Sequence, residues 1–451
     1  MEYQITLDGK RALIYGLGVT GRSAVRVLTE AGCRVHIYVD GVVSDREREE
    51  LVALAGGRSS SITIEGEMPV PDPSSFDFLL KASGISPDRP LLQEARRRRL
   101  EVITDIEMAY RLFGGENMVA ITGSNGKTTT TSLLTHLLRA SGRAAEACGN
   151  IGIPVLTTMR DAEPGIIFVL ECSSFQLENV RLFRPHRAAI LNLSPDHIDW
   201  HMTYEAYADA KAHIARAQTP EDQLWIHPND PEVRAALGRV GTSANIHPVR
   251  FDTPLAEKLR RNEGWALFGE HNVENAMFAA EIASDLGLDE QQIVDGLAGF
   301  HPVEHRMEYI ATVNDVIYIN DSKGTNVDAT VRALSGIHQP VFLIAGGYDK
   351  HVSFEALYEA FRPHGKKMLL IGQTAEQIQH EAEERGLGDR VVLCGTLKKA
   401  MEAAFAEAAP GDMVLLSPAS ASWGQYHHFE ERGDEFREHV LSWQKEQEEG
   451  K

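Results

Sequence analysis

Short apolar runs alternate with longer amphipathic stretches along almost the whole chain. Runs such as "GIIFVLE", "VFLIA" and "MVLLS" have the length and the aliphatic composition of buried strands. The stretches between them carry apolar residues with the period of a helix. Strands that alternate with helices are typical of α/β proteins with parallel sheets, so we predict an α/β fold. In such sheets ligands bind beyond the carboxyl ends of the strands, and the polar residues found there are the candidates for function.

The first strand–helix–strand pattern, "RALIYGLGVTGRSAVRVLTEAGCRVHIYVD", contains a glycine turn. Gly16, Gly18 and Gly21 follow the first strand, and Asp40 ends the second one. This spacing matches the fingerprint of a dinucleotide-binding unit, which has an acid about 20 residues beyond the glycines. It is the strongest support for an NAD-dependent dehydrogenase, but taken alone it is weak evidence, because any nucleoside diphosphate can use the same glycine turn.

A second glycine turn lies in "MVAITGSNGKTTTTSLL", from Met118 to Leu134. The usual phosphate-binding loop has a glycine five residues before the glycine of its Gly-Lys pair, where this chain has Ile121. The pattern still predicts a strand, a tight turn and a helix that begins near Lys127, so that backbone N–H groups and the helix dipole favour an anion. Lys127 would supply charge for the outer phosphates, and Thr128 a hydroxyl for Mg²⁺. The alternative is a plain glycine turn followed by a solvated lysine.

A carboxylate and a histidine follow the next predicted strands. Glu171 ends "GIIFVLE", where we expect an oxygen ligand for the magnesium of a neighbouring phosphate loop, although a helix-capping acid is the alternative. The strand "RAAILNL" leads to His197, Asp199 and His201, whose alternate spacing in a loop is weak evidence for zinc. We predict that His197 lies near phosphate or magnesium instead.

The helix predicted after this loop carries a lysine on its apolar face. At about 100° per residue, Lys211 falls on the same stripe as Tyr207 and Ile214. A lysine on a buried face costs free energy unless it is neutral, paired or functional. Its side chain could instead extend along the helix surface to water.

Polar residues also follow the strands that we predict in the C-terminal third. They are Asp321, Lys323, Thr325, Asn326, Lys350 and Ser422. Each of them could be a turn residue or a helix cap. Together they suggest a third domain that binds a substrate.

Length and charge narrow the choice of partners. A chain of 451 residues is too long for one core and suggests about three domains. Its net charge of -20 repels nucleic acid and acidic membrane surfaces. Four scattered cysteines without a CxxC pair indicate neither a disulfide framework nor a thiolate metal site. Because we find no signal core and no run long enough to span a bilayer, we expect a cytoplasmic protein whose partners are small molecules rather than nucleic acid or membrane.

Several motifs together resemble one enzyme family. They are, in chain order, "TGSNGKTT", "GNIGIP", "LECSSFQLE", "NLSPDHIDWH", "AYADAK", "GEHNVENAMFAA", "HRME", "NDSKGTN" and "LLSPASASWGQYHHFEERG". This set extends over essentially the whole chain and is similar to the Mur ligases of peptidoglycan synthesis, whose phosphate loop has the form TG[ST]NGK[ST]. The resemblance implies a Rossmann-like UDP-binding domain over residues 1–98, a P-loop ATPase-type domain over 99–302 and a Rossmann-like amino-acid-binding domain over 303–451.

The resemblance also implies a reaction. It is the ATP-dependent joining of D-glutamate to UDP-N-acetylmuramoyl-L-alanine through an acyl phosphate, with two Mg²⁺ ions and a carbamate formed on Lys211 of a monomeric enzyme. A sister ligase that adds a different amino acid is the first alternative. A folate-type polyglutamate ligase would share the ATP-binding domain, and a regulatory module would bind ATP without turnover.

Roles for single residues follow from the same resemblance. The implied catalytic residues are Lys127, Glu171, His197 and Lys211, and the implied metal ligands are Thr128, Glu171, His197 and the carbamate of Lys211. ATP would contact Gly123, Ser124, Asn125, Gly126, Lys127, Thr128, Thr129, Asn272, Asn275, Arg306 and Asp321. The UDP-substrate would contact Gly18, Thr20, Asp40 and Asn150, and D-glutamate would contact Lys323, Thr325, Lys350, Ser422 and Phe429. Because three domains contribute, we expect the C-terminal domain to close over the central one about a hinge near Phe300 to Val303.

Overall fold

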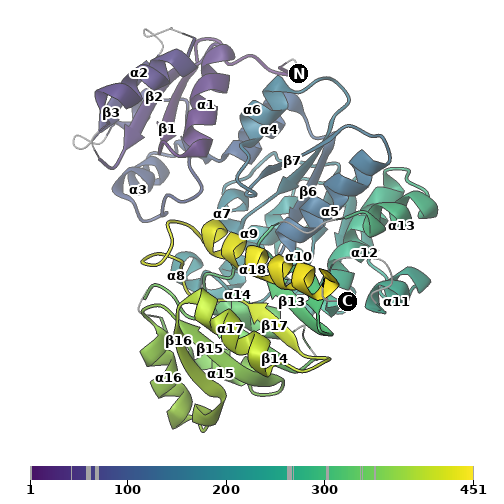
Figure 1. Cartoon of the computed structure of the whole chain (residues 1–451). Coiled ribbons are helices and arrows are strands. Elements are labelled where there is room, and N and C mark those ends of the chain that lie inside the picture. The colour runs from purple at the N-terminus through teal and green to yellow at the C-terminus, as the bar shows by residue number, and fades with distance from the viewer. Residues whose placement is uncertain are drawn as a thin grey trace. The chain divides into compact units, whose positions relative to one another are not determined.

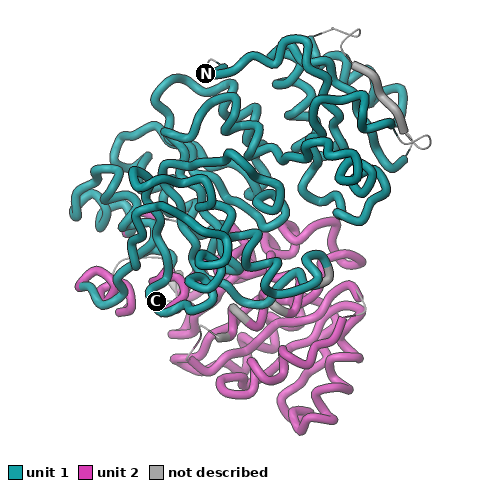
Figure 2. The backbone as a smooth tube through the Cα atoms, turned by 180° about the vertical axis from the view of Figure 1, so that it is seen from behind, with its two compact units in different colours: residues 1–253, 275–297 teal, residues 254–274, 298–451 magenta. Residues whose placement is uncertain are grey.

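The computed structural model describes residues 3–41, 43–56, 62–66, 71–261, 267, 269–300, 304–335, 337, 339–349 and 352–449. Lys350 and residues 301–303 of the expected hinge lie outside this set. The chain divides into two compact units, which are residues 1–253 with 275–297 and residues 254–274 with 298–451, and each is described by itself (Figures 1 and 2). No helix in the described part of the chain is long and apolar enough to cross a membrane.

The first sheet of unit 1 is parallel and has the strand order β3-β2-β1-β4-β5. Successive residues of β1, such as Leu13 and Ile14, point to opposite faces of the sheet, so both faces are apolar. Helices α1 and α2 cover one face and α3 covers the other. The elements are β1 Arg11–Tyr15, α1 Val19–Glu30, β2 Arg34–Val39, α2 Asp45–Leu54, β3 Ile62–Gly66, η2 Pro73–Ser75, β4 Phe78–Lys81, α3 Pro90–Arg97 and β5 Glu101–Ile103. Since β5 pairs with β4, this sheet continues past the domain limit that we predict at residue 98.

The second sheet of unit 1 is also parallel, in the order β11-β10-β9-β6-β8-β7. Its central strand β6 is fully buried, which explains the unbroken apolar run at its start. The strands are β6 Met118–Thr122, β7 Ala145–Gly149, β8 Ile167–Glu171, β9 Arg187–Ile190, β10 Gln223–Ile226 and β11 Asn245–Pro248. The helices are α4 Asp105–Phe113, α5 Lys127–Ala140, α6 Val155–Asp161, α7 Ser174–Leu177, α8 Ile198–His201, α9 Tyr204–Ala212, η3 His213–Ala215, α10 Pro231–Val240, α12 Glu270–Asp285, which begins in unit 2, and α13 Glu290–Ala298.

Register brings three strand ends of this second sheet together. Ile121 of β6 pairs with Glu171 of β8 on one side and with Ala189 of β9 on the other. The loops that leave β6, β8 and β9 therefore start at the same level of one sheet edge. These loops hold the phosphate-loop motif and the residues that follow Glu171 and Ile190.

Unit 2 contains the third sheet, in the order β12-β13-β17-β14-β15-β16. Only the pairing of β12 with β13 is antiparallel among its described pairs. Its strands are β12 Glu308–Val313, β13 Val316–Asn320, β14 Val341–Ala345, β15 Gly365–Ile371, β16 Val391–Gly395 and β17 Met413–Leu416. Its helices are α11 Pro254–Arg260, α14 Val327–Ser335, α15 Glu355–Phe361, α16 Ala375–Glu384, η4 Gly388–Arg390, α17 Leu397–Glu407 and α18 Phe429–Glu449.

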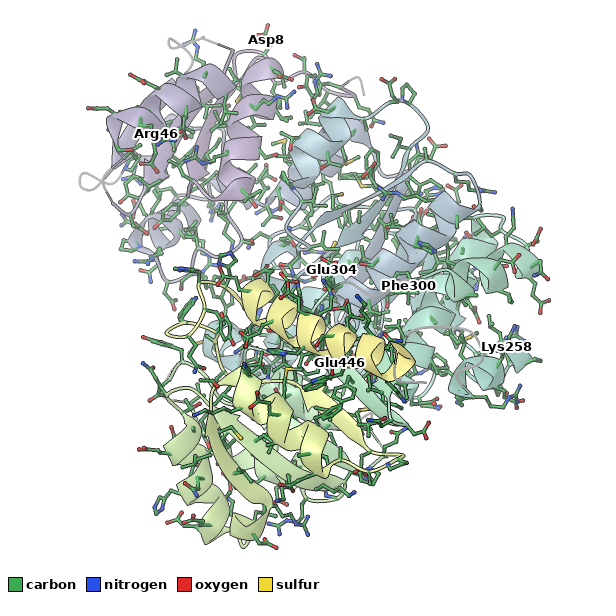
Figure 3. All side chains as sticks on the ribbon, viewed as in Figure 1. Asp8, Arg46, Lys258, Phe300, Glu304 and Glu446 are labelled. Carbon is green, nitrogen blue, oxygen red and sulfur yellow. The ribbon has the colours of Figure 1, made fainter. Side chains whose placement is uncertain are left out.

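Apolar cores lie on both faces of this third sheet, and charged side chains lie at the surface of both units. Asp8 and Arg46 are exposed examples in unit 1 (Figure 3). The predicted α/β fold with three domain-forming sheets is confirmed.

Candidate active site

The turn after β6 has a backbone that only glycine can supply at one position. Gly126 adopts a φ of +79° and forms the N-cap of α5, and a Cβ added there would collide with Oδ1 of Asn275. Gly123 has a φ of +156° at the start of the same turn. The strand, turn and helix that we predicted from the sequence are confirmed, and Lys127 is the first residue of the helix.

Side chains from the neighbouring loop fix the shape of this turn. The Ser124 hydroxyl donates to the carbonyl oxygen of Ser194 at 3.0 Å and lies 2.9 Å from the hydroxyl of Tyr207. The backbone N–H of Asn125 donates to Oδ1 of Asn192 at 2.9 Å. Our sequence reasoning missed Asn192, although it opens the quoted "NLSPDHIDWH" motif. A polar residue two positions after the end of strand β9, at the same sheet edge, was the available signal.

The Lys127 side chain folds back over its own turn. Its Nζ donates to the carbonyl oxygens of Gly123 at 2.8 Å and Ser124 at 2.9 Å. Thr128 and Thr129 follow in the first turn of α5 and are half-buried. The N–H groups of this first helical turn have no intrahelical acceptor, so the site combines a helix N-terminus with a cation, which favours a phosphate group.

Glu171 lies at the carboxyl end of β8 with its carboxylate buried. Its Oε1 accepts a hydrogen bond from Nδ2 of Asn150 at 2.8 Å. Its other oxygen, Oε2, is buried without a hydrogen-bond partner among the described residues. A buried carboxylate oxygen with a free lone pair is a hard donor that suits Mg²⁺, so the residues at this sheet edge fit a magnesium ion.

Lys211 lies on α9 with its ammonium group buried, as its stripe with Tyr207 and Ile214 predicted. Its Nζ donates to the carbonyl oxygen of Gly123 at 2.8 Å and lies 4.8 Å from the centre of the Tyr207 ring. Burial, together with the nearby charge of Lys127, lowers the pKa of Lys211 well below its usual value. The alternative that its side chain extends to water is wrong. The lowered pKa shifts Lys211 toward its neutral form, and its nitrogen faces the phosphate loop.

The two histidines of the "DHIDWH" stretch lie in different surroundings. His197 has a φ of +50° at the N-cap of α8, and its side chain is 48% exposed. His201 is buried, and its Nε2 lies 3.0 Å from the Ser174 hydroxyl. Burial lowers the pKa of His201. The ring of Phe175 packs against both, at 4.8 Å from His197 and 5.8 Å from His201, so it links the His197 loop to the segment that follows Glu171.

The glycine turn of the first sheet forms a separate site in unit 1. A Cβ on Gly21 would collide with the carbonyl oxygen of Gly16, whereas Gly18 at the N-cap of α1 has open space beside it. Thr20 lies in the first turn of α1. At the end of β2, Asp40 accepts hydrogen bonds from the Tyr15 hydroxyl at 2.9 and 2.7 Å.

Unit 2 holds the remaining candidates. Asp321 is buried and accepts hydrogen bonds from the Ser417 hydroxyl at 2.7 Å and from the backbone N–H of Met307 at 3.2 Å, and burial raises its pKa to about 6. The neighbouring Arg306 is exposed. Lys323 Nζ lies 5.7 Å from the centre of the Phe429 ring. Asn272 is buried on α12, three residues before Asn275 and thus close to the same helix face.

A cavity of about 590 Å³ opens beside these residues in unit 2. Thr325, Tyr348 and Ser420 are among the residues that line it. Ser422 is buried in the segment that follows β17. Lys350, which we predicted for this site, lies outside the described residues.

Sequence reasoning also missed Arg432, which is buried between segments of unit 2. Its guanidinium donates to the Ser322 hydroxyl at 3.0 Å, to the Ser322 carbonyl at 2.8 Å and to the Ser420 carbonyl at 3.3 Å. Burial lowers the pKa of Arg432 to about 10. It joins the "NDSKGTN" segment to the cavity wall. An arginine inside the quoted "HHFEERG" motif gave no sign of burial, because it lies among charged residues.

The structure thus brings together Asn150, Glu171, Lys211, Asn275 and the phosphate loop within unit 1. Gly18, Thr20 and Asp40 lie at the edge of the other sheet of that unit. The candidates Asp321, Lys323, Thr325, Ser422 and Phe429 belong to unit 2.

Comparisons with known proteins agree on one family. The model of the Mur ligase middle domain matches residues 121–283, and that of the Mur ligase glutamate ligase domain matches residues 305–420. The chain is 36% identical to the UDP-N-acetylmuramoylalanine–D-glutamate ligase of Thermoanaerobacter pseudethanolicus, covering 96% of this chain and 98% of that protein. It is 37% identical to the ligase of the same name from Geobacillus kaustophilus, covering 95% and 96% of the two chains.

Solved structures of lower identity share the fold. MurF ligase from Thermotoga maritima in complex with ADP matches with a TM-score of 0.56 and 15% identity, covering 97% of this chain and 96% of that one. The UDP-N-acetylmuramate-alanine ligase MurC from the same organism matches with a TM-score of 0.52 and 17% identity, covering 96% and 99%. At these identities the likeness concerns the fold alone.

Proposed function

The chain belongs to the Mur ligase family, and from this premise we propose that it uses ATP to join D-glutamate to UDP-N-acetylmuramoyl-L-alanine in peptidoglycan synthesis. We infer that the reaction takes place in the cytoplasm and is carried out by a monomer with three substrate-binding domains, the first of which includes β5 and so extends at least to Ile103. The chain is 36% and 37% identical to two D-glutamate ligases along nearly its whole length. This similarity supports D-glutamate as the substrate over the amino acid of a sister enzyme.

ATP binds with its phosphates at the turn between β6 and α5. The turn from Gly123 to Gly126, with Lys127, Thr128 and Thr129, holds the phosphates through backbone N–H groups and one ammonium group. The Lys127 ammonium, which donates to carbonyl oxygens of the turn, lies where it can also donate to phosphate oxygens. We also assign contacts with ATP to Asn272, Asn275, Arg306 and Asp321.

Thr128, Glu171, His197 and the modified Lys211 would hold two magnesium ions. The ions supply charge that offsets the repulsion between an incoming carboxylate and the polyphosphate. The free Oε2 of Glu171 supports this set, since the hydrogen bond from Asn150 fixes the carboxylate while leaving that oxygen available.

Lys211 is carbamylated in the active enzyme. Its neutral nitrogen attacks CO₂, a C–N bond forms, and the nitrogen loses a proton to solvent, so the side chain changes from neutral to anionic. The lowered pKa of Lys211 supports this step, because a protonated amine has no lone pair for the attack. The resulting oxygens are ligands of the kind that magnesium prefers.

The other two substrates bind at the remaining sites. Gly18, Thr20 and Asp40 contact the UDP portion, and Asn150 contacts the sugar side of the UDP-substrate. D-glutamate binds through Lys323, Thr325, Lys350, Ser422 and Phe429.

The reaction proceeds in two steps. A carboxylate oxygen of the substrate's L-alanine attacks the γ-phosphorus of ATP, an O–P bond forms, and the bond to ADP breaks. The amine of D-glutamate then attacks the acyl carbon, an amide bond forms, phosphate leaves, and the nitrogen loses its proton. The preformed turn and its cation stabilise the negative charge that moves between phosphoryl oxygens during the first step.

The observation that carries this proposal is the buried Lys211 amine bonded to the phosphate loop beside Glu171. The test measures phosphate release by the purified protein with Mg-ATP and UDP-N-acetylmuramoyl-L-alanine. We expect release with D-glutamate and none with L-glutamate, L-alanine, L-lysine or meso-diaminopimelate. Release with one of the other amino acids instead would assign the chain to a sister activity. No release with any of them would contradict the ligase proposal.

A further inference from the structure

A second buried lysine lies at the edge of the first sheet. Lys81 is the last residue of β4, and it pairs in register with Tyr15, the residue directly before the Gly16 turn. The chain order of this sheet reverses between β1 and β4, and ligands of doubly wound sheets bind at that point. The segment after Lys81 packs on the turn itself, since a Cβ on Gly16 would lie 3.1 Å from the Cβ of Ala82. Lys81 therefore borders the place where a nucleoside diphosphate would bind.

The Lys81 ammonium is poorly satisfied in the free protein. The residue is 1% exposed, and it forms no ion pair with any residue that the structure describes. Its Nζ donates one long hydrogen bond, to the carbonyl oxygen of Ile85 at 3.4 Å, and lies 5.3 Å from the centre of the Trp200 ring. An ammonium group has three N–H donors, so most of its capacity for hydrogen bonds is left for another acceptor.

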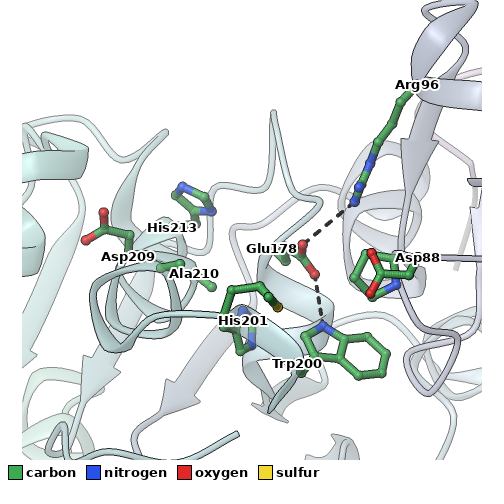
Figure 4. A pocket seen from close by; sticks show the side chains of 11 residues that line it. Asp88, Arg96, Glu178, Trp200, His201, Asp209, Ala210 and His213 are labelled. Carbon is green, nitrogen blue, oxygen red and sulfur yellow. Dashed lines mark hydrogen bonds and ion pairs between the residues drawn. The ribbon is translucent and has the colours of Figure 1, made fainter. Parts of the chain in front are cut away.

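The charged groups around Lys81 belong to three helices or their ends. Figure 4 shows Glu178, which follows α7, between Arg96 of α3 and Trp200 of α8. Its Oε1 lies 3.9 Å from Arg96, and its Oε2 accepts a hydrogen bond from the Trp200 Nε1–H at 3.4 Å. Glu178 is thus already engaged by two other donors. Asp105 of α4 is the remaining acid, and it accepts hydrogen bonds from Nε2 of Gln176.

Burial lowers the pKa of Lys81 to about 8, which Glu178 and Asp105 partly oppose and Arg96 reinforces. Near neutral pH the ammonium form is still the major one. It is a desolvated cation, and the local acids have other partners. An anion brought to this edge of the sheet would relieve the cost of its burial.

We propose that Lys81 is a substrate-binding residue that contacts the diphosphate of the UDP-substrate. This inference rests on the proposed function and adds a residue to the UDP site beyond the glycine turn, Thr20 and Asp40. Lys81 fixes the diphosphate from the β4 side, while the N-terminus of α1 faces it from the β1 side.

The test is the equilibrium binding of UDP-N-acetylmuramoyl-L-alanine, of UDP and of uridine, measured by calorimetry from pH 7 to pH 9.5. We expect Lys81→Met to weaken binding of the first two about tenfold at pH 7, the size of one lost charge-assisted hydrogen bond, and to leave uridine unaffected. In the wild type, affinity for UDP falls above pH 8, because Lys81 must then gain a proton on binding. Lys81→Met has no such decline, and Lys81→Arg, which stays charged, keeps its affinity to higher pH.

The matched control is Lys10→Met, which removes the same charge from the same sheet. Lys10 precedes β1 at the opposite sheet edge and is exposed, with an ion pair to Asp77 at 3.3 Å. Its loss should leave UDP binding unchanged. If Lys81→Met and wild type bound UDP with equal affinity, the role of Lys81 would be overturned and the proposed function would stand. The same holds if the affinities of the two proteins for UDP changed with pH in the same way. If the wild-type protein did not bind the UDP-substrate at all, both this inference and the proposed function would be overturned.

Discussion

Unit 1 contains two motifs in which a strand leads through a glycine turn into a helix. Their backbones are similar, but the charged side chains around them differ. In the first, β1 leads through Gly16 and Gly18 into α1, and in the second, β6 leads through Gly123 and Gly126 into α5. Both present a helix N-terminus at the carboxyl edge of a parallel sheet, which is a general arrangement for binding phosphate groups. The backbone alone therefore predicts nucleotide binding at both turns, but it does not indicate how the functions of the two turns differ.

The acids beside the two turns explain the difference. The two oxygens of Asp40 share the single proton of the Tyr15 hydroxyl, and one of them lies 3.5 Å from Nε of Arg89, so protein side chains engage this carboxylate. One buried oxygen of Glu171 has no hydrogen-bond partner in the part of the chain that the structure describes. Burial lowers the pKa of both lysines, and the charges nearby differ in order of size: after burial, the positive Lys127 has the largest effect on the pKa of Lys211 and lowers it, whereas Glu178 has the largest effect on the pKa of Lys81 and raises it. The first motif is suited to holding a diphosphate, and the second to a metal-assisted reaction at phosphorus.

The largest expected effect comes from removing the lysine beside the second turn. Lys211→Met should reduce turnover at least about a thousandfold, because it deletes the nitrogen that would form the proposed carbamate ligand of magnesium. The fold should persist, since methionine fills the same buried space without a charge. Phosphate release and circular dichroism measure the two quantities. The exposed Lys10→Met variant is the control with normal turnover.

A carbamate on Lys211 has a direct signature as well. Wild-type protein in ¹³C-bicarbonate should give a carbamate carbon resonance that is absent from Lys211→Met. A variant that retains near-normal turnover would exclude the carbamate from the reaction.

The second prediction concerns the free oxygen of Glu171. Glu171→Gln keeps the shape and a possible contact to Asn150 but removes the negative charge, so we expect turnover to fall about a hundredfold and to need more magnesium. Asp40→Asn is the matched change at the first turn, where no metal role is proposed. Its magnesium dependence should equal that of the wild type. Measuring activity as a function of Mg²⁺ concentration distinguishes the two variants. If Glu171→Gln needed no more Mg²⁺ than the wild type, Glu171 would not be a magnesium ligand.

The third prediction compares one glycine from each turn. Gly126→Ala forces a side chain into a φ of +79° against Asn275, which should cost about 1–3 kcal/mol of stability and raise the KM for ATP about tenfold. Gly18→Ala meets open space at a φ of -62°, so stability should be unchanged. Its Cβ should still obstruct the diphosphate and raise only the KM for the UDP-substrate. Thermal unfolding and the two KM values test this, and a stability loss in Gly18→Ala would show that the two turns are alike.

Much of this arrangement could be predicted from the sequence, because its signals are local. The alternation of apolar runs and helical stretches predicted the α/β fold, and the helical stripe of Tyr207, Lys211 and Ile214 placed the lysine on an apolar face, while it left open whether the side chain reaches water. The prediction that a strand ends at Glu171 is also confirmed. In each case the relevant period or spacing lies within one element or at its end.

The features that escaped prediction depend on pairing between distant segments. Asn192 matters because β9 lies next to β6, and Arg432 because α18 returns to the "NDSKGTN" segment. Lys81 ends a short strand, and nothing in "FLLKASG" indicates that Trp200, far along the chain, covers it. The order of strands and the docking of loops set these contacts, and local patterns do not contain them.

The smallest predicted effect is the pH dependence of stability at the first turn. The pKa of Lys81 is about 8 in the folded protein against 10.5 for an ordinary lysine, so between these values the unfolded chain binds more protons. The free energy of unfolding contributed by this group therefore rises with pH in that window, by about 1 kcal/mol per unit. Urea unfolding at pH 7.5 and 9.5 should show Lys81→Met more stable than wild type at the lower pH, with the gap narrowing at the higher one. A constant gap would mean that Lys81 is paired in the folded protein, and the contrast between the two lysines would then lose its electrostatic basis.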